Sequence, residues 1–227
     1  LSESGCCGDS NLTYAKAVSI QKHLRAALEL KPPEGRIRRV AGADVGFTKD
    51  GQHAIAGFVL FSWGDLEVVD VALASRKVDF PYIPGLLSFR EIPVLVAAYR
   101  RLEASPDVIF CDGQGLAHPR RFGLASHLGV LLSKPTIGCA KSVLVGTFKE
   151  PGARRGSRTN MTDEDECVGC ALRTRDNVRE MYISPGHMMD TPTAARLVLE
   201  AGRGYRLPEP TRAAHNLVAR AKEIHRK

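Results

Sequence analysis

Hydrophobic and polar residues follow two different periods along the chain. Between Thr13 and Leu30 the apolar residues recur at helical spacing, whereas short apolar runs bounded by turn residues predict strands. Three strands in a row, followed by alternating helices and strands, are typical of a mixed sheet flanked by helices. The predicted fold class is therefore α/β. Helices are predicted at about residues 13–30, 87–104, 122–132, 190–202 and 210–226, and strands at 39–47, 54–62, 66–77, 135–140, 167–174 and 179–184, with one more strand ending at Asp112.

Three segments stand apart from these elements. Gly64-Asp65 predicts a tight hairpin turn between the second and third strands. The proline-rich residues 80–85 predict a stiff loop, and residues 149–166, first basic and then acidic, predict a solvated excursion. Residues 1–12 are expected to form a flexible lead. Because no linker of domain size follows, residues 13–227 are expected to form a single domain.

The charge of the chain narrows the kind of partner. Its formal net charge is +7 and its pI is near 9.2, which favours a polyanion. Aromatic residues make up only 6% of the chain, which argues against broad platforms for base stacking. No apolar run is long enough to span a membrane, and the first residues lack the layout of a signal peptide. We therefore expect a monomer in the cytoplasm that has no membrane partner.

The most informative stretch surrounds Asp112. A run of four apolar residues ends at this acid, and Gly113 follows it, so that a ligand or another backbone segment can approach closely. In open α/β sheets, ligands bind beyond the carboxyl ends of the strands. His118, Arg120 and Arg121 place positive charge near the acid. This combination indicates metal-assisted chemistry on phosphate. Alternatively, Asp112 caps a turn and the arginines form a solvated face.

Further acids and a lysine lie near the predicted strands. Asp44 lies within the first strand, Glu91 near the start of a helix, and Lys141 directly after a strand. Magnesium prefers carboxylate oxygens, and a nearby lysine can offset charge on a phosphate. A lone acid in an apolar strand is costly without a cation or partner, which favours a functional role for Asp44. Glu91 could instead form a capping box with Ser88, and Lys141 could be a surface lysine.

The histidines give a weaker signal. His127 falls among apolar residues of a predicted helix, which indicates a packed core histidine or one on the helix face. His187 follows Ser184-Pro185-Gly186, and its spacing assigns it no role. His215 lies on the last predicted helix, where spacing alone indicates a residue on the helix face.

Five motifs together resemble the endonuclease V family in its bacterial form. The resemblance extends from about residue 14 to about residue 225, and it departs from the family pattern at Cys139. The motifs are Gly42–Phe47, Pro81–Glu91, Asp112–Arg121, Gly138–Lys141 and Leu207–Arg212.

This resemblance implies a ribonuclease-H-like mixed β-sheet flanked by α-helices, and a DNA-repair endonuclease. The enzyme would recognise deoxyinosine, which is deaminated adenine, and would hydrolyse the second phosphodiester bond on its 3′ side. Water would attack in line with the help of magnesium (Mg2+), for which manganese (Mn2+) can substitute, leaving 3′-hydroxyl and 5′-phosphate ends. The alternatives are an endoribonuclease specific for inosine in RNA, and a non-catalytic, basic nucleic-acid-binding protein.

The resemblance also assigns roles to individual residues. It implies that Asp44, Asp112 and Glu91 hold the metal and that Lys141 and His215 support catalysis. Tyr82 would belong to a wedge that contacts the target DNA.

The chemistry of the substrate suggests how the remaining residues contribute. Exposing the edge of a damaged base requires the base to be flipped out, and a stiff loop can fill the gap that it leaves. Hypoxanthine offers O6 as an acceptor and N1–H as a donor, a pattern that backbone groups can distinguish from that of adenine. The loop residues are Tyr82, Ile83 and Pro84, the expected base pocket consists of Gly85, Leu87 and Gly113, and the expected phosphate contacts are Arg90, His118, Arg120 and Arg121.

Overall fold

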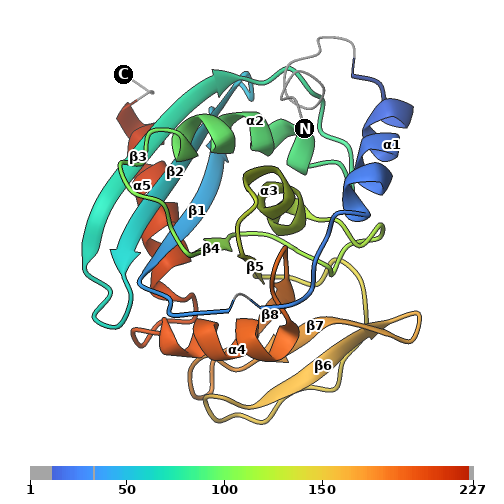
Figure 1. Cartoon of the computed structure of the whole chain (residues 1–227), viewed down its shortest axis with the longest axis vertical. Helices are drawn as coiled ribbons and strands as arrows, with labels where there is room; N and C mark the ends of the chain where they lie inside the picture. The colour runs from blue at the N-terminus through green and yellow to red at the C-terminus, as the bar shows by residue number, and fades with distance from the viewer. Residues whose placement is uncertain (1–11, 33, 225–227) are drawn as a thin grey trace.

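A single mixed sheet runs through the computed structural model, which describes residues 12–32 and 34–224. Its eight strands lie in the order β3-β2-β1-β4-β5-β8-β7-β6 (Figure 1). Strands β1, β4 and β5 are parallel to one another, and the other neighbouring strands are antiparallel. The strands are β1 (Arg39–Phe47), β2 (His53–Ser62), β3 (Val68–Lys77), β4 (Val108–Cys111), β5 (Thr136–Ala140), β6 (Arg158–Asp163), β7 (Glu166–Leu172) and β8 (Met181–Pro185).

Helices cover both faces of this sheet (Figure 1). Helices α2 and α3 pack on one face over an apolar cluster that includes Ala41 and Ala43 of β1. Helices α4 and α5 pack on the other face over a cluster that includes Val40. The predicted α/β class is therefore confirmed. The helices are α1 (Tyr14–Arg25), α2 (Ser88–Tyr99), α3 (Leu124–Leu132), α4 (Thr191–Glu200) and α5 (Glu209–Ile224).

The alternation of side chains along β1 decides where its acid points. Val40 packs in the cluster beneath α5, and residues two apart in a strand share a face. Asp44 therefore points toward α5. Gly42 lies between them on the same face, and a Cβ atom there would lie 1.8 Å from the carbonyl oxygen of Pro210. Glycine thus allows the start of α5 to rest directly on the backbone of β1.

We expect Gly42→Ala to destabilise the protein by about 1–3 kcal/mol, because α5 must move away from β1 to admit the methyl group. The melting temperature and the urea midpoint should both fall. Gly152→Ala is the matched control, since its Cβ would meet only the Ser157 side chain, at 3.1 Å. Equal stability of the two variants would contradict the close packing of α5.

Some predicted boundaries are wrong for reasons that lie in tertiary contacts. The first helix ends at Arg25 and not at Leu30. The following chain is held in place because the carbonyl oxygen of Glu29 accepts from the Met188 N–H at 2.8 Å. The expected solvated excursion at 149–166 contains β6, which pairs with β7 as the last strand of the sheet.

Two further expectations need correction. The connection between β2 and β3 spans residues 63–67, so it is longer than the tight turn expected at Gly64-Asp65. Helix α2 ends at Tyr99, and Pro93 lies inside it. The expected lead at residues 1–12 lies outside the described residues except for Leu12, and the single domain at 13–227 stays a prediction. Among the described helices, none is long and apolar enough to cross a membrane.

Candidate active site

Two acids and a histidine from three elements meet at one edge of the sheet. Asp44 lies in β1, Asp112 directly follows β4, and His215 lies in α5. One ligand atom from each lies within 4.8 Å of the others, and the Nδ1 atom of His215 is 3.0 Å from the Oδ2 atom of Asp44. The Asp112 N–H donates to the carbonyl oxygen of Ala43, which ties the two acidic segments together.

Lys141 joins this group from the neighbouring strand. It directly follows β5, which is parallel to β4, so both strands deliver their next residue to the same edge. The Nζ atom of Lys141 lies 2.5 Å from the Oδ2 atom of Asp112. The structure thus brings together Asp44, Asp112, Lys141 and His215.

Glu91 approaches from α2, on the other face of the sheet. It is 7% exposed, and burial, followed by the charges of Asp44 and Asp112, raises its pKa to about 8. Glu91 is not in the 4.8 Å group, but it lines the same pocket as Asp112. The capping-box alternative is not supported, because α2 begins after Leu87 without a side-chain cap and the Ser88 hydroxyl contacts His127.

The crowding of acids fits a divalent cation. Burial and the charge of Asp112 raise the pKa of Asp44, against the opposing effect of His215. Carboxylates that repel one another in this way are stabilised by a bound cation. Hard oxygen ligands suit magnesium or manganese, and one imidazole is compatible with manganese.

A pocket of about 380 Å³ opens beside Asp112 and Lys141. Gly85, Leu87 and Gly113, the predicted base-pocket residues, all line it, and Glu91 lies in its wall. Further lining comes from Tyr82, Pro84, Ser88, Gln114, His118, Gly123, Leu124, Ala140, Ser142, Val143 and Leu144.

The loop that contains the predicted wedge forms one rim of this pocket. Tyr82 is 66% exposed, and Pro84 is exposed as well. Phe80 and Leu86, on either side, are buried in a small apolar cluster against which Ile83 packs. The loop is therefore anchored at both ends while Tyr82 projects into solvent.

The carbonyl oxygen of Gly85 accepts hydrogen bonds from three side chains. It accepts hydrogen bonds from Nε2 of Gln21 at 3.1 Å, from Nε2 of His118 at 3.0 Å and from Nη2 of Arg120. Gly85 has φ +76°, a conformation that favours glycine. These contacts fix the loop at the pocket.

His118 lies inside the protein and not on its surface. Burial lowers its pKa to about 4, so the ring is neutral at pH 7. Its Nε2 donates to Gly85, and its Nδ1 accepts from the Arg120 N–H at 3.1 Å. A neutral ring with both nitrogens bonded is poorly suited to hold a phosphate, and we leave His118 out of the proposed DNA contacts.

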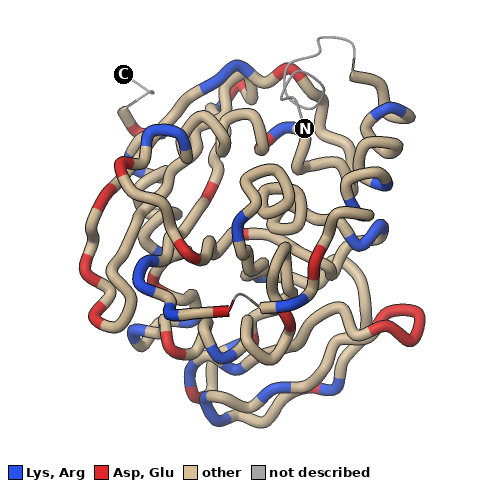
Figure 2. Tube along the Cα trace, viewed as in Figure 1, with Lys and Arg blue, Asp and Glu red and all other residues tan. Residues whose placement is uncertain are grey.

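Arg121 is also engaged within the protein. It is 7% exposed, and its guanidinium pairs with Asp163 at 2.7 Å and Glu166 at 2.6 Å. These acids flank the tip between β6 and β7, the acidic loop at the right of Figure 2. The acidic segment is therefore partly paired, and the guanidinium of Arg121 is engaged by two carboxylates within the protein.

Arg90 and Arg120 differ in how much of each guanidinium is used. Arg120 donates from Nε to the Oε1 atom of Gln21 at 2.6 Å, besides its bond to Gly85. Arg90 lies over the ring of Phe47, 4.6 Å from its centroid, and no ion pair of Arg90 is found in the described part of the chain. Arg90 therefore stays a predicted phosphate contact.

Sequence reasoning missed two glutamines. Gln21 on α1 holds Gly85, and its isolated position in a helix gives no signal of that contact. Gln114 donates from Nε2 to the carbonyl oxygen of Ser142 at 2.9 Å, and its place two residues after Asp112 was a usable signal. His127 is fully buried, in agreement with a packed core histidine, and His187 is buried, with its Nδ1 accepting from the Glu29 N–H at 3.3 Å.

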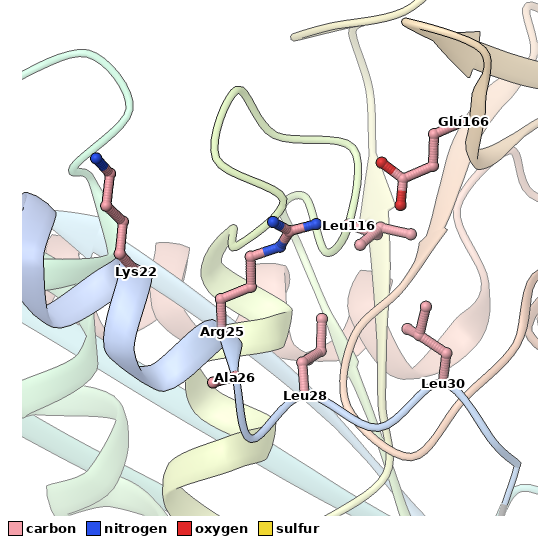
Figure 3. Close-up of a pocket in the computed structure, with 7 residues that line it drawn as sticks. All are labelled: Lys22, Arg25, Ala26, Leu28, Leu30, Leu116 and Glu166. Carbon is pink, nitrogen blue, oxygen red and sulfur yellow. The ribbon is translucent and has the colours of Figure 1, made fainter.

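A second hollow, of about 340 Å³, lies between α1 and the β6–β7 tip. Figure 3 shows Arg25 extending from α1 toward Leu116, with Glu166 on the opposite wall. None of the acids that meet at the sheet edge lines it. The pocket beside Asp112 is therefore the candidate active site.

A comparison with protein families matches residues 21–216 to the model described as Endonuclease V. The chain belongs to the endonuclease V family. Membership supports the predicted assignment as a nuclease. An endonuclease V from Roseiflexus sp. is 50% identical to this chain over 207 residues, which cover 91% of this chain and 92% of the relative.

Solved structures agree with the family. The endonuclease V of Streptomyces avermitilis is 42% identical with a TM-score of 0.91, and the match covers 95% of each chain. The Ciona intestinalis endonuclease V (D234N), in complex with a DNA that contains an inosine followed by a ribo-adenosine, is 27% identical with a TM-score of 0.83, over 93% of this chain and 99% of that one. The predicted ribonuclease-H-like mixed sheet is confirmed.

Proposed function

We propose that this member of the endonuclease V family is a metal-dependent DNA-repair nuclease that hydrolyses the second phosphodiester bond 3′ to deoxyinosine, leaving 3′-hydroxyl and 5′-phosphate ends. The observation that carries the proposal is the meeting of Asp44, Asp112 and His215 within 4.8 Å beside a pocket of about 380 Å³. The acids suit a cation, and the pocket has room for one flipped base. The expected monomeric state and cytoplasmic location stay predictions.

Asp44 and Asp112 would hold the metal, with His215 or Glu91 completing the site. When bound, magnesium or manganese supplies positive charge that stabilises the attacking and leaving oxygens of an in-line displacement. Lys141 would place its ammonium at the same phosphate, where it offsets charge that develops on the phosphoryl oxygens. His215 would orient the carboxylate of Asp44 through their 3.0 Å contact.

The walls of the pocket support recognition of a base with few charged groups. Its rim carries Tyr82 and Pro84, which can fill the gap that a flipped nucleotide leaves. Gly85 and Gly113 leave space at the wall for a purine edge. Arg90 would hold a phosphate of the same strand, so affinity should fall as salt rises.

The deciding experiment compares matched strands that carry one inosine or one adenosine. We expect nicking of the inosine strand in magnesium and no nicking in EDTA. The 5′ fragment should be one nucleotide longer than the fragment that cleavage at the first bond 3′ to the inosine would give. Magnesium-independent nicking, or equal nicking of both strands, would contradict the proposal.

RNA is the second candidate substrate. The Ciona relative was captured with a DNA in which a ribo-adenosine follows the inosine, and that ribonucleotide lies beside the bond at issue. An all-RNA strand with one inosine should therefore be tested in parallel. Faster nicking of the RNA strand than of the matched DNA strand would favour the endoribonuclease.

We expect Gly113→Ala to narrow the pocket without unfolding the protein. The added Cβ would lie 3.2 Å from the Leu124 side chain, which can shift. Nicking of inosine relative to adenosine should fall by about tenfold, because a misfitted base loses contacts that are made only in the correct pose. Single-turnover rates on the two strands give this ratio. Unchanged selectivity would count against Gly113 as a pocket residue, and affinity for undamaged DNA serves as the internal control.

A further inference from the structure

Lys141 stands just past the end of its strand. The last pair of the β5–β8 ladder is Ala140 with Tyr182, so the backbone of Lys141 has left the sheet. Its side chain is 39% exposed, and an ion pair at such a site contributes little rigidity. The ammonium can stay at Asp112 only if the backbone beneath it is held by another contact.

Arg206, in the segment between α4 and α5, makes that contact. Its Nη2 donates to the carbonyl oxygen of Lys141 at 3.0 Å and to that of Glu180 at 2.7 Å. Its Nε donates to the carbonyl oxygen of Arg179 at 2.9 Å. One guanidinium therefore joins the residue after β5 to the two residues that precede β8.

The chemistry of arginine suits this role. Its planar fork of N–H donors can serve three carbonyl oxygens at once, whereas the ammonium of lysine is a single point. The backbone of Arg206 is itself fixed, because the hydroxyl of buried Thr174 donates to its carbonyl oxygen at 2.6 Å. Burial and the nearby charge of Arg179 lower the pKa of Arg206.

We propose that Arg206 is a positioning residue that anchors the backbone of Lys141 and so keeps the Lys141 ammonium at Asp112. This inference rests on the proposed function, because it assigns Arg206 a part in the same reaction. Gln114 holds the next residue, because its Nε2 donates to the carbonyl oxygen of Ser142 at 2.9 Å. Two long side chains from distant segments thus bond consecutive carbonyl oxygens, those of Lys141 and Ser142.

A double-mutant cycle tests whether Arg206 acts through Lys141. We expect Arg206→Ala to lower the single-turnover nicking rate of the inosine strand by about 10- to 100-fold, since small displacements of a catalytic group are costly. In the Lys141→Ala background, the same change should cost only about twofold, because the group that it positions is gone. Arg206→Lys, which keeps the charge but loses the fork, should be intermediate.

Arg203→Ala is the matched control. Arg203 also donates from Nη2 to two backbone carbonyl oxygens, those of Gly64 and Asp65, at 3.2 and 2.9 Å, but in the loop between β2 and β3. The Arg203→Ala variant should nick the inosine strand at the wild-type rate. The proposal would be overturned if Arg206→Ala lowered the nicking rate by the same factor in the wild-type and the Lys141→Ala backgrounds. It would also be overturned if Arg206→Ala did not lower the rate at all. Weaker DNA binding with a smaller salt dependence would also overturn it, by making Arg206 a phosphate contact.

A spectroscopic measurement tests the anchor without any nicking. Lys-Ser occurs once in the sequence, at Lys141-Ser142, so labelling lysine with 13C at the carbonyl and serine with 15N isolates that peptide group. Loss of the hydrogen bond should shift the Lys141 carbonyl resonance in Arg206→Ala and Arg206→Lys but not in Arg203→Ala. An unchanged resonance refutes the anchor. If the Arg206 variants show the shift but the wild-type protein never nicks the inosine strand, the anchor stands and the proposed function is refuted.

Discussion

Asp44→Asn is expected to abolish inosine-directed nicking, with a loss of about a thousandfold or more, while DNA binding remains. The change removes the charge of one of the two acids whose ligand atoms lie within 4.8 Å of each other, and it leaves the shape of the side chain intact. The fold should persist, because burial and Asp112 already raise the pKa of Asp44 and the neutral amide relieves that repulsion. Single-turnover nicking and fluorescence anisotropy measure the two properties separately.

Asp165→Asn is the control for this prediction, since Asp165 is exposed at the β6–β7 tip. It should nick like the wild type. Persistent nicking by Asp44→Asn would eliminate Asp44 as a metal ligand. A wild-type protein that binds inosine strands but never nicks them would instead support the non-catalytic binder, the alternative that the charge of +7 leaves open.

Glu91→Gln is expected to stabilise the metal-free protein at alkaline pH and to abolish nicking. The pKa of Glu91 is about 8 in the folded protein, against an ordinary 4.5. Well below pH 4.5 the carboxyl is protonated in both states and costs nothing. As the pH rises to 8, the unfolded chain loses this proton while the folded chain keeps it, so stability falls. Glutamine removes that loss, on the order of 2–4 kcal/mol at pH 8.

Thermal unfolding in EDTA at pH 5 and pH 8 measures this effect. The variant should be only slightly more stable than the wild type at pH 5 and clearly more stable at pH 8. Magnesium should stabilise the wild type more than the variant, because a cation favours the ionised carboxylate. A variant that is less stable at pH 8 would show that Glu91 is paired in the metal-free protein.

The same pKa predicts how nicking depends on pH. If Glu91 must be ionised to hold a metal, the wild-type rate at low magnesium should rise with pH up to about 8. Higher magnesium should move this rise to lower pH, since metal and proton compete for one carboxylate.

The roles of the basic residues after Asp112 show where local reasoning stops. His118, Arg120 and Arg121 follow the acid closely in the sequence, which predicts that they hold phosphate. Within the protein, their side chains bond to segments far along the chain, at Gly85 and Glu166 among others. A nearby charge can be read from a sequence, but its partner depends on which distant segment folds against it.

The sequence by itself determined the order of the helices and strands other than β6, and it singled out the acids Asp44 and Asp112. Asp44 and Asp112 each stand out because an apolar strand pattern predicts burial, and a carboxylate in such a place needs a cation or a partner. The long motifs were sufficient to indicate the family. Local periodicity carries this information because it records which side chains avoid water.

Only the tertiary structure decided which groups complete the site. His215 has the spacing of an ordinary residue on a helix face, and it reaches Asp44 because Gly42 lets α5 rest on β1. The end of α1 at Arg25 and the anchoring of Lys141 by Arg206 likewise depend on hydrogen bonds between segments far apart in sequence. Such contacts leave no period in the sequence, because each depends on where two remote backbones meet.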